Sequence, residues 1–404
     1  MELGDDPDEA AFRSVARSWL DVHATPYRPD ANLGGLSLVF ADLGDVDHLD
    51  RGRAWQRELC ADGWAGLGWP VEHGGRNLPL SLRAIWAEEL SAAGAPAPIN
   101  LLGEAVVAPT LLTHGTLDQK RRFLAPILTA EEIWCQLFSE PGAGSDLAGV
   151  TTTATRDGDG WVVDGRKVWV SGAHYADWAV LLARTDWDAP KHQGCTYFLL
   201  DMHQPGVTVR PVRQMTGGSA FHEVGLSAVR VADGHRLGPV GGGWEVAMTT
   251  LVHERLQLGL GLARTGGDIE HLLAQLRPHG VADDPVVRQL AARLVIDARC
   301  AQYLGWRMVS QAAVGHGPGP DASLAKLASG RVTRRSDELA EAMRGAGAML
   351  CDRYSPSQLW APATRIAGGT DEILKNIVAE RVLGLPAEPR TDTHVPFRDT
   401  VRGA

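Results

Sequence analysis

The chain has 404 residues, more than a single hydrophobic core supports, so we expect two or three cooperating lobes. With 44% hydrophobic and 22% charged residues it has the composition of an ordinary globular protein, and no apolar run is long enough for a membrane span. The formal charge of −10 argues against nucleic-acid binding, and the acidic start, Met1–Glu9, lacks the apolar run of a signal peptide. We therefore expect a cytoplasmic protein.

The cysteines and the basic clusters limit other functions. Five cysteines, an odd number spread far apart, suit free thiols better than a disulfide framework or a zinc site. The negative charge means that an anionic substrate would need a local basic patch. Lys120–Arg122 and Arg331 with Arg334 and Arg335 are candidates, although a solvated helix face is the preferred interpretation of each.

Residues 1–132 predict an N-terminal helical domain. Asp6 followed by Pro7 is typical of a helix start, and Leu80–Leu90 carries helical apolar spacing. Thr116–Gln119 fits a capping box that opens a helix to about residue 129. Between these helices, Gly63–Gly75 is too rich in glycine and proline to be helix or strand.

Residues 133–240 predict a central, β-barrel-like domain, because the hydrophobic period changes to two. Asp157–Gly160 is a strong hairpin signal. The expected strands are 133–138, 150–156, 161–167, 178–184, 195–201, 207–212 and 223–231.

Residues 241–404 predict a C-terminal helical bundle. Asp284 and Pro285 open a helix that reaches to about Gly315, and further helices are expected over 323–343 and 370–383. The predicted fold is therefore an α+β multidomain protein, with a β domain between two helical segments.

The segment Leu137–Gly149 follows the first strand and combines turn residues with polar side chains. Gly142 and Gly144 can adopt positive φ and can let backbone N–H groups approach a ligand closely. Ser139, Ser145 and Asp146 add hydroxyl and carboxylate groups. On these residues alone, a ligand-binding loop and an ordinary turn both remain open.

Trp169 and Ser171 form a second candidate. By the period-two rule they lie on the same side of a strand, where an aromatic face and a hydroxyl would suit a flat heterocycle. The alternative is an indole in the core beside a buried hydroxyl.

Four motifs together resemble the acyl-CoA dehydrogenase family. They are Glu140–Asp146 (EPGAGSD), Lys167–Gly172 (KVWVSG), Val240–Trp244 (VGGGW) and Glu380–Pro386 (ERVLGLP), in this order and spacing. The resemblance extends from about Gly63 to Pro386.

This resemblance implies an FAD flavoprotein that oxidises an acyl-CoA or carrier-protein thioester in lipid metabolism. It implies electron-transfer flavoprotein or a similar electron acceptor, and a homotetramer or homodimer. The matching residues are Phe138 and Ser139 at the flavin ring, Gly144 and Ser145 at flavin or thioester, Trp169 against the ring system, Ser171 toward N5, and Thr370 near the adenosine diphosphate.

The same resemblance implies a carboxylate base that removes the α-proton. Many relatives carry it before a Gly-Thr pair, where this chain has Gly368, whereas isovaleryl and long-chain types carry it at the position of Glu254. We assign Glu254 as base, the Gly368 N–H to the thioester oxygen and Arg255 to substrate binding. A structural Glu254 paired with an arginine is the alternative, with Asp371 and Glu372 as rival bases.

Glu254 follows His253, but the second histidine of a zinc motif is missing, so we predict no metal. Arg277–Pro285 and Glu341–Gly347 depart from the family pattern at its adenosine and intersubunit contacts. A non-catalytic or half-site partner of a heteromer is therefore an alternative, as is an oxygen-using flavoenzyme. Branched, steroid-derived and medium-chain thioesters all remain open, and we expect helices over 81–100 to line the acyl pocket with the Glu254 helix.

Overall fold

The computed structural model describes residues 4–27, 46–263, 265–313, 319, 321–352 and 354–400. The chain groups into two compact units. The helical unit comprises Met1–Val39, Asn77–Ala97 and Arg255–Ala387, and the sheet unit comprises Phe40–Arg76, Pro98–Glu254 and Glu388–Ala404. The division at residues 132 and 240 made from the sequence stays a prediction.

Two of the helices before the sheet begin where capping signals in the sequence place them. Asp6 and Thr116 each accept a backbone N–H and complete a capping box, which confirms the expected starts of α1 and α5. The segment Gly63–Gly75 is irregular apart from a short 3-10 turn, and a π-helical turn, Gly103–Val107, precedes α4. The helices are α1 (Pro7–His23), α2 (Val46–Ala61), α3 (Leu80–Ala92), α4 (Ala108–His114) and α5 (Leu117–Leu128).

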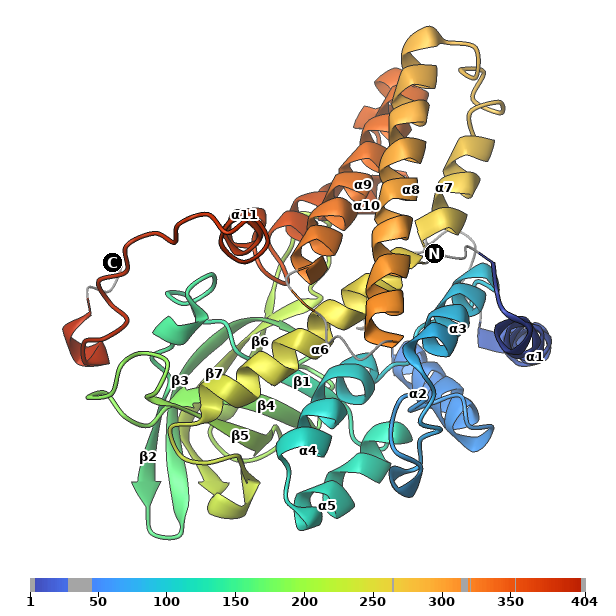
Figure 1. Cartoon of the computed structure of the whole chain (residues 1–404). Coiled ribbons are helices and arrows are strands. Elements are labelled where there is room, and N and C mark those ends of the chain that lie inside the picture. Colours follow the sequence, from blue (N-terminus) through green and yellow to red (C-terminus); the bar gives the residue numbers. More distant parts are fainter. Residues whose placement is uncertain are drawn as a thin grey trace. The chain divides into compact units, whose positions relative to one another are not determined.

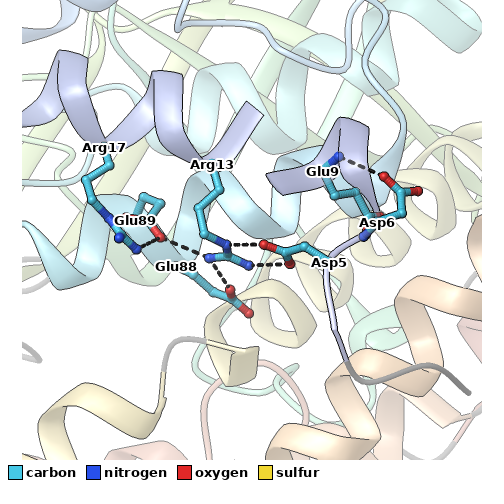
Figure 2. A network of polar contacts seen from close by, with 7 residues as sticks. All are labelled: Asp5, Asp6, Glu9, Arg13, Arg17, Glu88 and Glu89. Atoms are coloured by element: carbon cyan, nitrogen blue, oxygen red, sulfur yellow. Dashed lines mark hydrogen bonds and ion pairs between the residues drawn. The ribbon is translucent and has the colours of Figure 1, made fainter. Parts of the chain in front are cut away.

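An ion-pair network joins α1 to α3 in the helical unit, as Figure 2 shows. Arg13 donates to Asp5, Glu88 and Glu89, and Arg17 donates through two nitrogens to Glu89. Glu89 is only 4% exposed, and its burial would be costly without these two guanidinium groups. The sequence reasoning did not predict this network, because its partners are about 75 residues apart.

The sheet unit holds one mixed sheet of eight strands, shown in green in Figure 1. Its order is β6-β7-β3-β2-β4-β5-β8, and β1 pairs with β4 in parallel. Gly158, at φ +60°, turns the chain between β2 and β3, as the hairpin signal predicts. The strands are β1 (Trp134–Leu137), β2 (Thr153–Asp157), β3 (Gly160–Ser171), β4 (Trp178–Arg184), β5 (Cys195–Asp201), β6 (Val207–Val212), β7 (Phe221–Ala232) and β8 (Arg236–Leu237).

Burial along the strands follows their place in the sheet. Strand β4 is buried at every position, because it has strand neighbours on both edges and packing on both faces. Strand β7 instead alternates through its first half. The α+β fold class, with a sheet between helical segments, is confirmed.

The C-terminal helices from Arg255 onward build the larger part of the helical unit. Asp284 accepts the backbone N–H groups of Val286 and Val287, which confirms the predicted start of α8. Helices α7, α8 and α9 lie side by side (Figure 1) and share a core around Leu294 and Leu339. The helices are α6 (Gly243–Ala263), α7 (Thr265–Ala274), α8 (Pro285–Ala313), α9 (Asp321–Arg344), α10 (Ser355–Trp360) and α11 (Asp371–Arg381).

Three predictions about composition can be compared with the structure. All five cysteines are free thiols. The basic clusters are paired with carboxylates, for example Arg122 with Glu132 and Arg335 with Glu338, which agrees with solvated helix faces. We find no helix in the described ranges whose length and hydropathy would suit a membrane span.

Candidate functional site

The loop after β1 closes as a tight turn. The backbone groups of Glu140 and Ala143 exchange two hydrogen bonds of 3.0 and 3.1 Å across Pro141 and Gly142. Neither Gly142 nor Gly144 uses the positive φ that glycine permits, and the turn closes without it. A Cβ at Gly142 or Gly144 would meet no described atom within 4 Å, so neither conformation nor packing among the described residues requires glycine there. Close approach of a ligand remains a reason for them.

A buried ion pair fixes this loop to the sheet. The Lys167 Nζ lies 2.8 Å from Glu140 Oε1 and also donates to the carbonyl oxygens of Phe138 and Leu182. The Glu140 carboxylate in addition accepts the backbone N–H groups of Thr151 and Thr152. One ammonium group therefore joins the end of β1, strand β3 and strand β4.

The pair is ionised because its partners offset the cost of burial. Burial opposes ionisation of Glu140, but the charge of Lys167 and the surrounding hydrogen bonds outweigh it and lower the pKa of Glu140 to about 2. Burial lowers the pKa of Lys167, and the Glu140 charge opposes that change. In the sequence, Glu140 and Lys167 were noted only as members of two separate motifs, and their contact was not predicted.

Trp169 and Ser171 are both exposed, with the buried Val170 between them, as the period-two rule predicts. Lys167 has the same parity but is buried, because a bulge between Lys167 and Val170 shifts the register of β3 against β7. At this bulge Trp169 adopts φ +60°, which is rare for a bulky residue and marks a candidate functional position.

The Trp169 indole is 61% exposed and touches Phe221 edge-on at 5.9 Å between ring centroids. The alternative of a core indole is therefore wrong. The Ser139 carbonyl accepts the Val168 N–H at 2.9 Å, so the end of β1 is held beside the strand that carries Trp169 and Ser171. Phe138 is buried there, and Ser139 is half-buried.

The rest of the loop is held by a second ion cluster. Asp146 accepts two hydrogen bonds from Lys191 Nζ, at 3.0 and 3.1 Å, and Asp392 accepts a third at 2.5 Å. Gly144 and Ser145 lie exposed just before Asp146. Lys191 connects the loop at Asp146 to the C-terminal segment at Asp392, and no local sequence pattern predicted this role.

Glu254 and Arg255 lie on α6 and are both half-buried. As neighbours on a helix they point in different directions. Thr250, one turn before Glu254, is fully buried against other parts of the sheet unit.

The remaining predicted residues lie in the helical unit. Gly368 and Gly369 adopt φ +66° and +94°, so a glutamate in place of Gly368 would be strained. Thr370 caps α11 by accepting the Ile373 N–H at 3.2 Å. The rival base Asp371 accepts from Arg365 at 2.9 Å.

Burial opposes ionisation of Asp371, yet its pairs with Arg365 and Lys326 lower its pKa, which makes it a weak base.

The predicted site residues are divided between the two units. The sheet unit contains Phe138, Ser139, Gly144, Ser145, Trp169, Ser171 and Glu254, and the helical unit contains Arg255, Gly368 and Thr370.

The sheet-unit residues suit a flat aromatic cofactor such as FAD. The Trp169 indole is mostly exposed, and its backbone is held in a strained conformation, so it offers a surface for stacking. The nearby Ser171 hydroxyl can hydrogen-bond to heteroatoms of the cofactor ring. Within the described residues, no group of three or more His, Cys, Asp or Glu side chains is arranged to hold a metal ion.

Comparison with known proteins finds matches to three consecutive parts of the chain. Family models match the acyl-CoA dehydrogenase N-terminal domain at residues 6–131, the middle domain at 135–229 and the C-terminal domain at 241–383.

Individual relatives match over almost the whole chain. Acyl-CoA dehydrogenase IpdE1 of Mycobacterium tuberculosis is 39% identical over 393 residues, which cover 95% of this chain and 99% of that protein. The solved Tcur3481-Tcur3483 steroid ACAD has a TM-score of 0.84 at 29% identity and covers 96% of this chain and 100% of its own. The ChsE4-ChsE5 complex from Mycobacterium tuberculosis has a TM-score of 0.81 at 30% identity, with the same two coverages.

Proposed function

The chain belongs to the acyl-CoA dehydrogenase family of oxidoreductases, and we propose that it uses FAD to convert an acyl-CoA to a 2-enoyl-CoA, with Glu254 as the base. The resemblance seen in the sequence is thereby confirmed, and members of this family are flavoproteins. The observation that carries the FAD proposal is the exposed Trp169 indole, held in a strained bulge beside the end of β1.

Each residue has a defined task in this proposal. Bound FAD supplies the acceptor for the hydride that leaves the β-carbon. The flavin ring is bound and oriented by Phe138, Ser139, Trp169 and Ser171. Thr370 binds near the adenosine diphosphate part of FAD. Glu254 takes the α-proton, which requires a carboxylate kept away from bulk water, and the half-buried position of Glu254 supports that role.

The assignments at the thioester rest on the family resemblance. The Gly368 N–H would donate to the thioester oxygen and stabilise the charge that develops there when the proton leaves. Gly144 and Ser145 would bind the flavin or the thioester, and Arg255 would bind the substrate. The left-handed backbone at Gly368 supports a base elsewhere, because a glutamate would be disfavoured in that conformation.

We propose a steroid-derived acyl-CoA as substrate, since one solved relative is described as a steroid ACAD. The electron acceptor would be electron-transfer flavoprotein or a similar protein. Homotetramer and homodimer are the assemblies that the family resemblance implies.

A heteromer is the second candidate, in which this chain is a half-site or non-catalytic partner. The two solved structures compared above are named as pairs of different components. The glycine in place of the usual glutamate at 368 also favours division of a site between related chains. Purification without yellow colour, restored by co-expression with an adjacent-gene relative, would support this candidate.

The test is anaerobic bleaching of the flavin in the purified full chain by CoA thioesters of butyric, isobutyric, octanoic, palmitic and cholan-24-oic acids. We expect the cholan-24-oic thioester to be fastest. Glu254→Gln should keep the flavin spectrum and lower the reduction rate about 10²- to 10⁴-fold, the usual contribution of a general base.

Glu245→Gln is the matched control, because Glu245 lies exposed on the same helix. The assignment of Glu254 fails if Glu254→Gln reduces its flavin as fast as this control. Steady oxygen consumption without an added acceptor would instead indicate an oxygen-using flavoenzyme.

A further inference from the structure

Tyr197 on β5 lies between Phe138 and helix α6. Its side chain is fully buried, and its ring meets the Phe138 ring edge-on, with centroids 5.8 Å apart. Its hydroxyl oxygen lies 2.9 Å from Thr250 Oγ1 on α6. One side chain thus contacts both a proposed flavin-contact residue and the helix of the proposed base.

Thr250 is the point where α6 is held. Its hydroxyl donates to the Val246 carbonyl at 3.1 Å, one turn earlier, and Thr110 Oγ1 of α4 lies 3.2 Å away. The Thr110 hydroxyl in turn donates to the Val106 carbonyl at 2.9 Å. Because both threonines have carbonyl acceptors for their protons, the Tyr197 O–H is the donor to Thr250 in the arrangement that uses every proton.

Other contacts hold the first half of α6 and the turn that precedes it. The His114 Nε2 of α4 lies 2.8 Å from Thr249 Oγ1, and the Gly241 N–H donates to Thr196 Oγ1 on β5 at 3.0 Å. A Cβ on Gly243 would come within 2.5 Å of the Thr196 carbonyl carbon, so only glycine lets α6 begin so close to β5. Residues 241–250 are therefore fixed to two neighbouring elements.

Glu254 lies four residues after Thr250, on the same face of α6 and about 6 Å farther along the axis. A shift or rotation of the helix at Thr250 would therefore move Glu254 by a similar amount. Proton abstraction is sensitive to such a shift, since a displacement of about 1 Å at a reacting group can cost about 100-fold in rate.

We propose that Tyr197 and Thr250 are positioning residues that set the place of Glu254 relative to Phe138 during proton abstraction. The proposal rests on the role of Glu254 stated above. The Tyr197 hydroxyl contacts α6, and the Tyr197 ring contacts Phe138. One buried side chain therefore holds both the helix of the base and the flavin-contact residue Phe138. Neither residue is assigned a contact with substrate.

The test compares Thr250→Val and Tyr197→Phe, which remove one hydroxyl each and keep the shape of the side chain. Thr250→Ser keeps the hydroxyl and serves as the rescue variant. Thr333→Val is the matched control, because Thr333 is also a buried helical threonine and its hydroxyl donates to its own helix, at Ser329.

The limiting rate of flavin reduction is measured anaerobically with the CoA thioester of the panel above that reduces the wild-type flavin fastest. We expect Thr250→Val and Tyr197→Phe to lower this limiting rate roughly ten- to a hundred-fold. The half-saturating thioester concentration should change less than about twofold, since the substrate contacts are intact. Thr250→Ser and Thr333→Val should keep the wild-type rate.

Hydrogen exchange of the flavin-free full chain gives a readout independent of turnover. Backbone amides of residues 246–254 should exchange faster in Thr250→Val and Tyr197→Phe than in Thr333→Val. Thr250→Val and Tyr197→Phe reducing their flavin at the wild-type rate would overturn the proposal, as would Thr250→Ser being as slow as Thr250→Val.

Glu254→Gln separates this proposal from the proposed function. If Glu254→Gln is inactive while Thr250→Val and Tyr197→Phe are normal, only the positioning role is wrong. If Glu254→Gln reduces its flavin normally, the assignment of the base is wrong and the positioning role falls with it.

Discussion

The Lys167 ammonium and the Glu140 carboxylate form an ion pair of 2.8 Å in which both side chains are almost fully buried. The same ammonium accounts for the position of the Phe138 carbonyl, so the pair supports the end of β1 as well as the loop. A buried charge that loses its partner is strongly destabilising, and therefore the two residues should behave as one energetic unit.

We expect Lys167→Met to lower the free energy of unfolding by about 3–5 kcal/mol, because it leaves the Glu140 carboxylate buried without a counter-charge. Adding Glu140→Gln should restore part of this loss. Urea unfolding of the single and double variants measures the coupling. Arg230→Met is the control: its exposed pair with Asp157 should contribute no more than about 1 kcal/mol, and an equal loss there would contradict the prediction.

Trp169→Ala tests whether the exposed indole is a binding surface. We expect little change in the stability of the flavin-free protein, because the side chain is 61% exposed, but a clear loss of FAD affinity. Trp161→Ala is the control, since Trp161 is buried in the sheet core and its loss should cost about 3–5 kcal/mol. Thermal unfolding and flavin titration measure the two effects. Equal destabilisation by both substitutions would assign Trp169 to packing.

The local patterns of the sequence predicted the strands well. Strands β4, β5 and β6 begin and end at the predicted residues, because their alternation and their flanking turns are local features. The same reasoning placed Trp169 and Ser171 on one face. It could not place Lys167 on the other, because the bulge that shifts the register depends on pairing with β7, about 50 residues later.

Polar contacts between distant segments were not predictable in this way. Glu140 and Lys167 were recognised only as parts of two motifs. Their contact arises because the end of β1 lies beside β3, where the Val168 N–H donates to the Ser139 carbonyl, and no local pattern encodes this. Gly142 does not use the positive φ open to it, because a glycine in a sequence indicates conformational freedom and not whether that freedom is used. Lys191 was missed because its partner Asp392 lies 201 residues away.

The raised pKa of Asp337, on α9, leads us to expect an unusual dependence of stability on pH. Burial raises its pKa to about 6, although a 3.1 Å hydrogen bond from Ser357 opposes the change. Between about pH 4 and 6 the folded protein keeps a proton that the unfolded chain has lost, so stability falls as pH rises through this window. The loss should amount to at most about 3 kcal/mol above pH 6.

Asp337→Asn removes this titration. We expect the variant to match the wild type near pH 4 and to be more stable at pH 7.5, as measured by urea unfolding at both values. Asp283→Asn, at an exposed position, is the control and should leave the pH profile unchanged. A variant that is no more stable than the wild type at pH 7.5 would contradict the prediction.

Phe397 holds the C-terminal segment on the sheet unit. Its ring is 3% exposed and lies 3.4 Å below the Arg184 guanidinium, while its N–H donates to the Ala189 carbonyl at 3.0 Å. Phe397→Ala removes most of this apolar burial, at a local cost of about 3–5 kcal/mol. We expect residues 388–400 to detach without unfolding the sheet, whose core does not include them.

Hydrogen exchange and limited proteolysis of the full chain measure the detachment. Amides of residues 388–400 should lose protection in Phe397→Ala, while those of β4 and β5 keep it. Because Lys191 pairs with both Asp392 and Asp146, detachment should also loosen the loop at Asp146 and lower flavin affinity. Unchanged protection of residues 388–400 would show that the backbone and ion-pair contacts hold the segment without the ring.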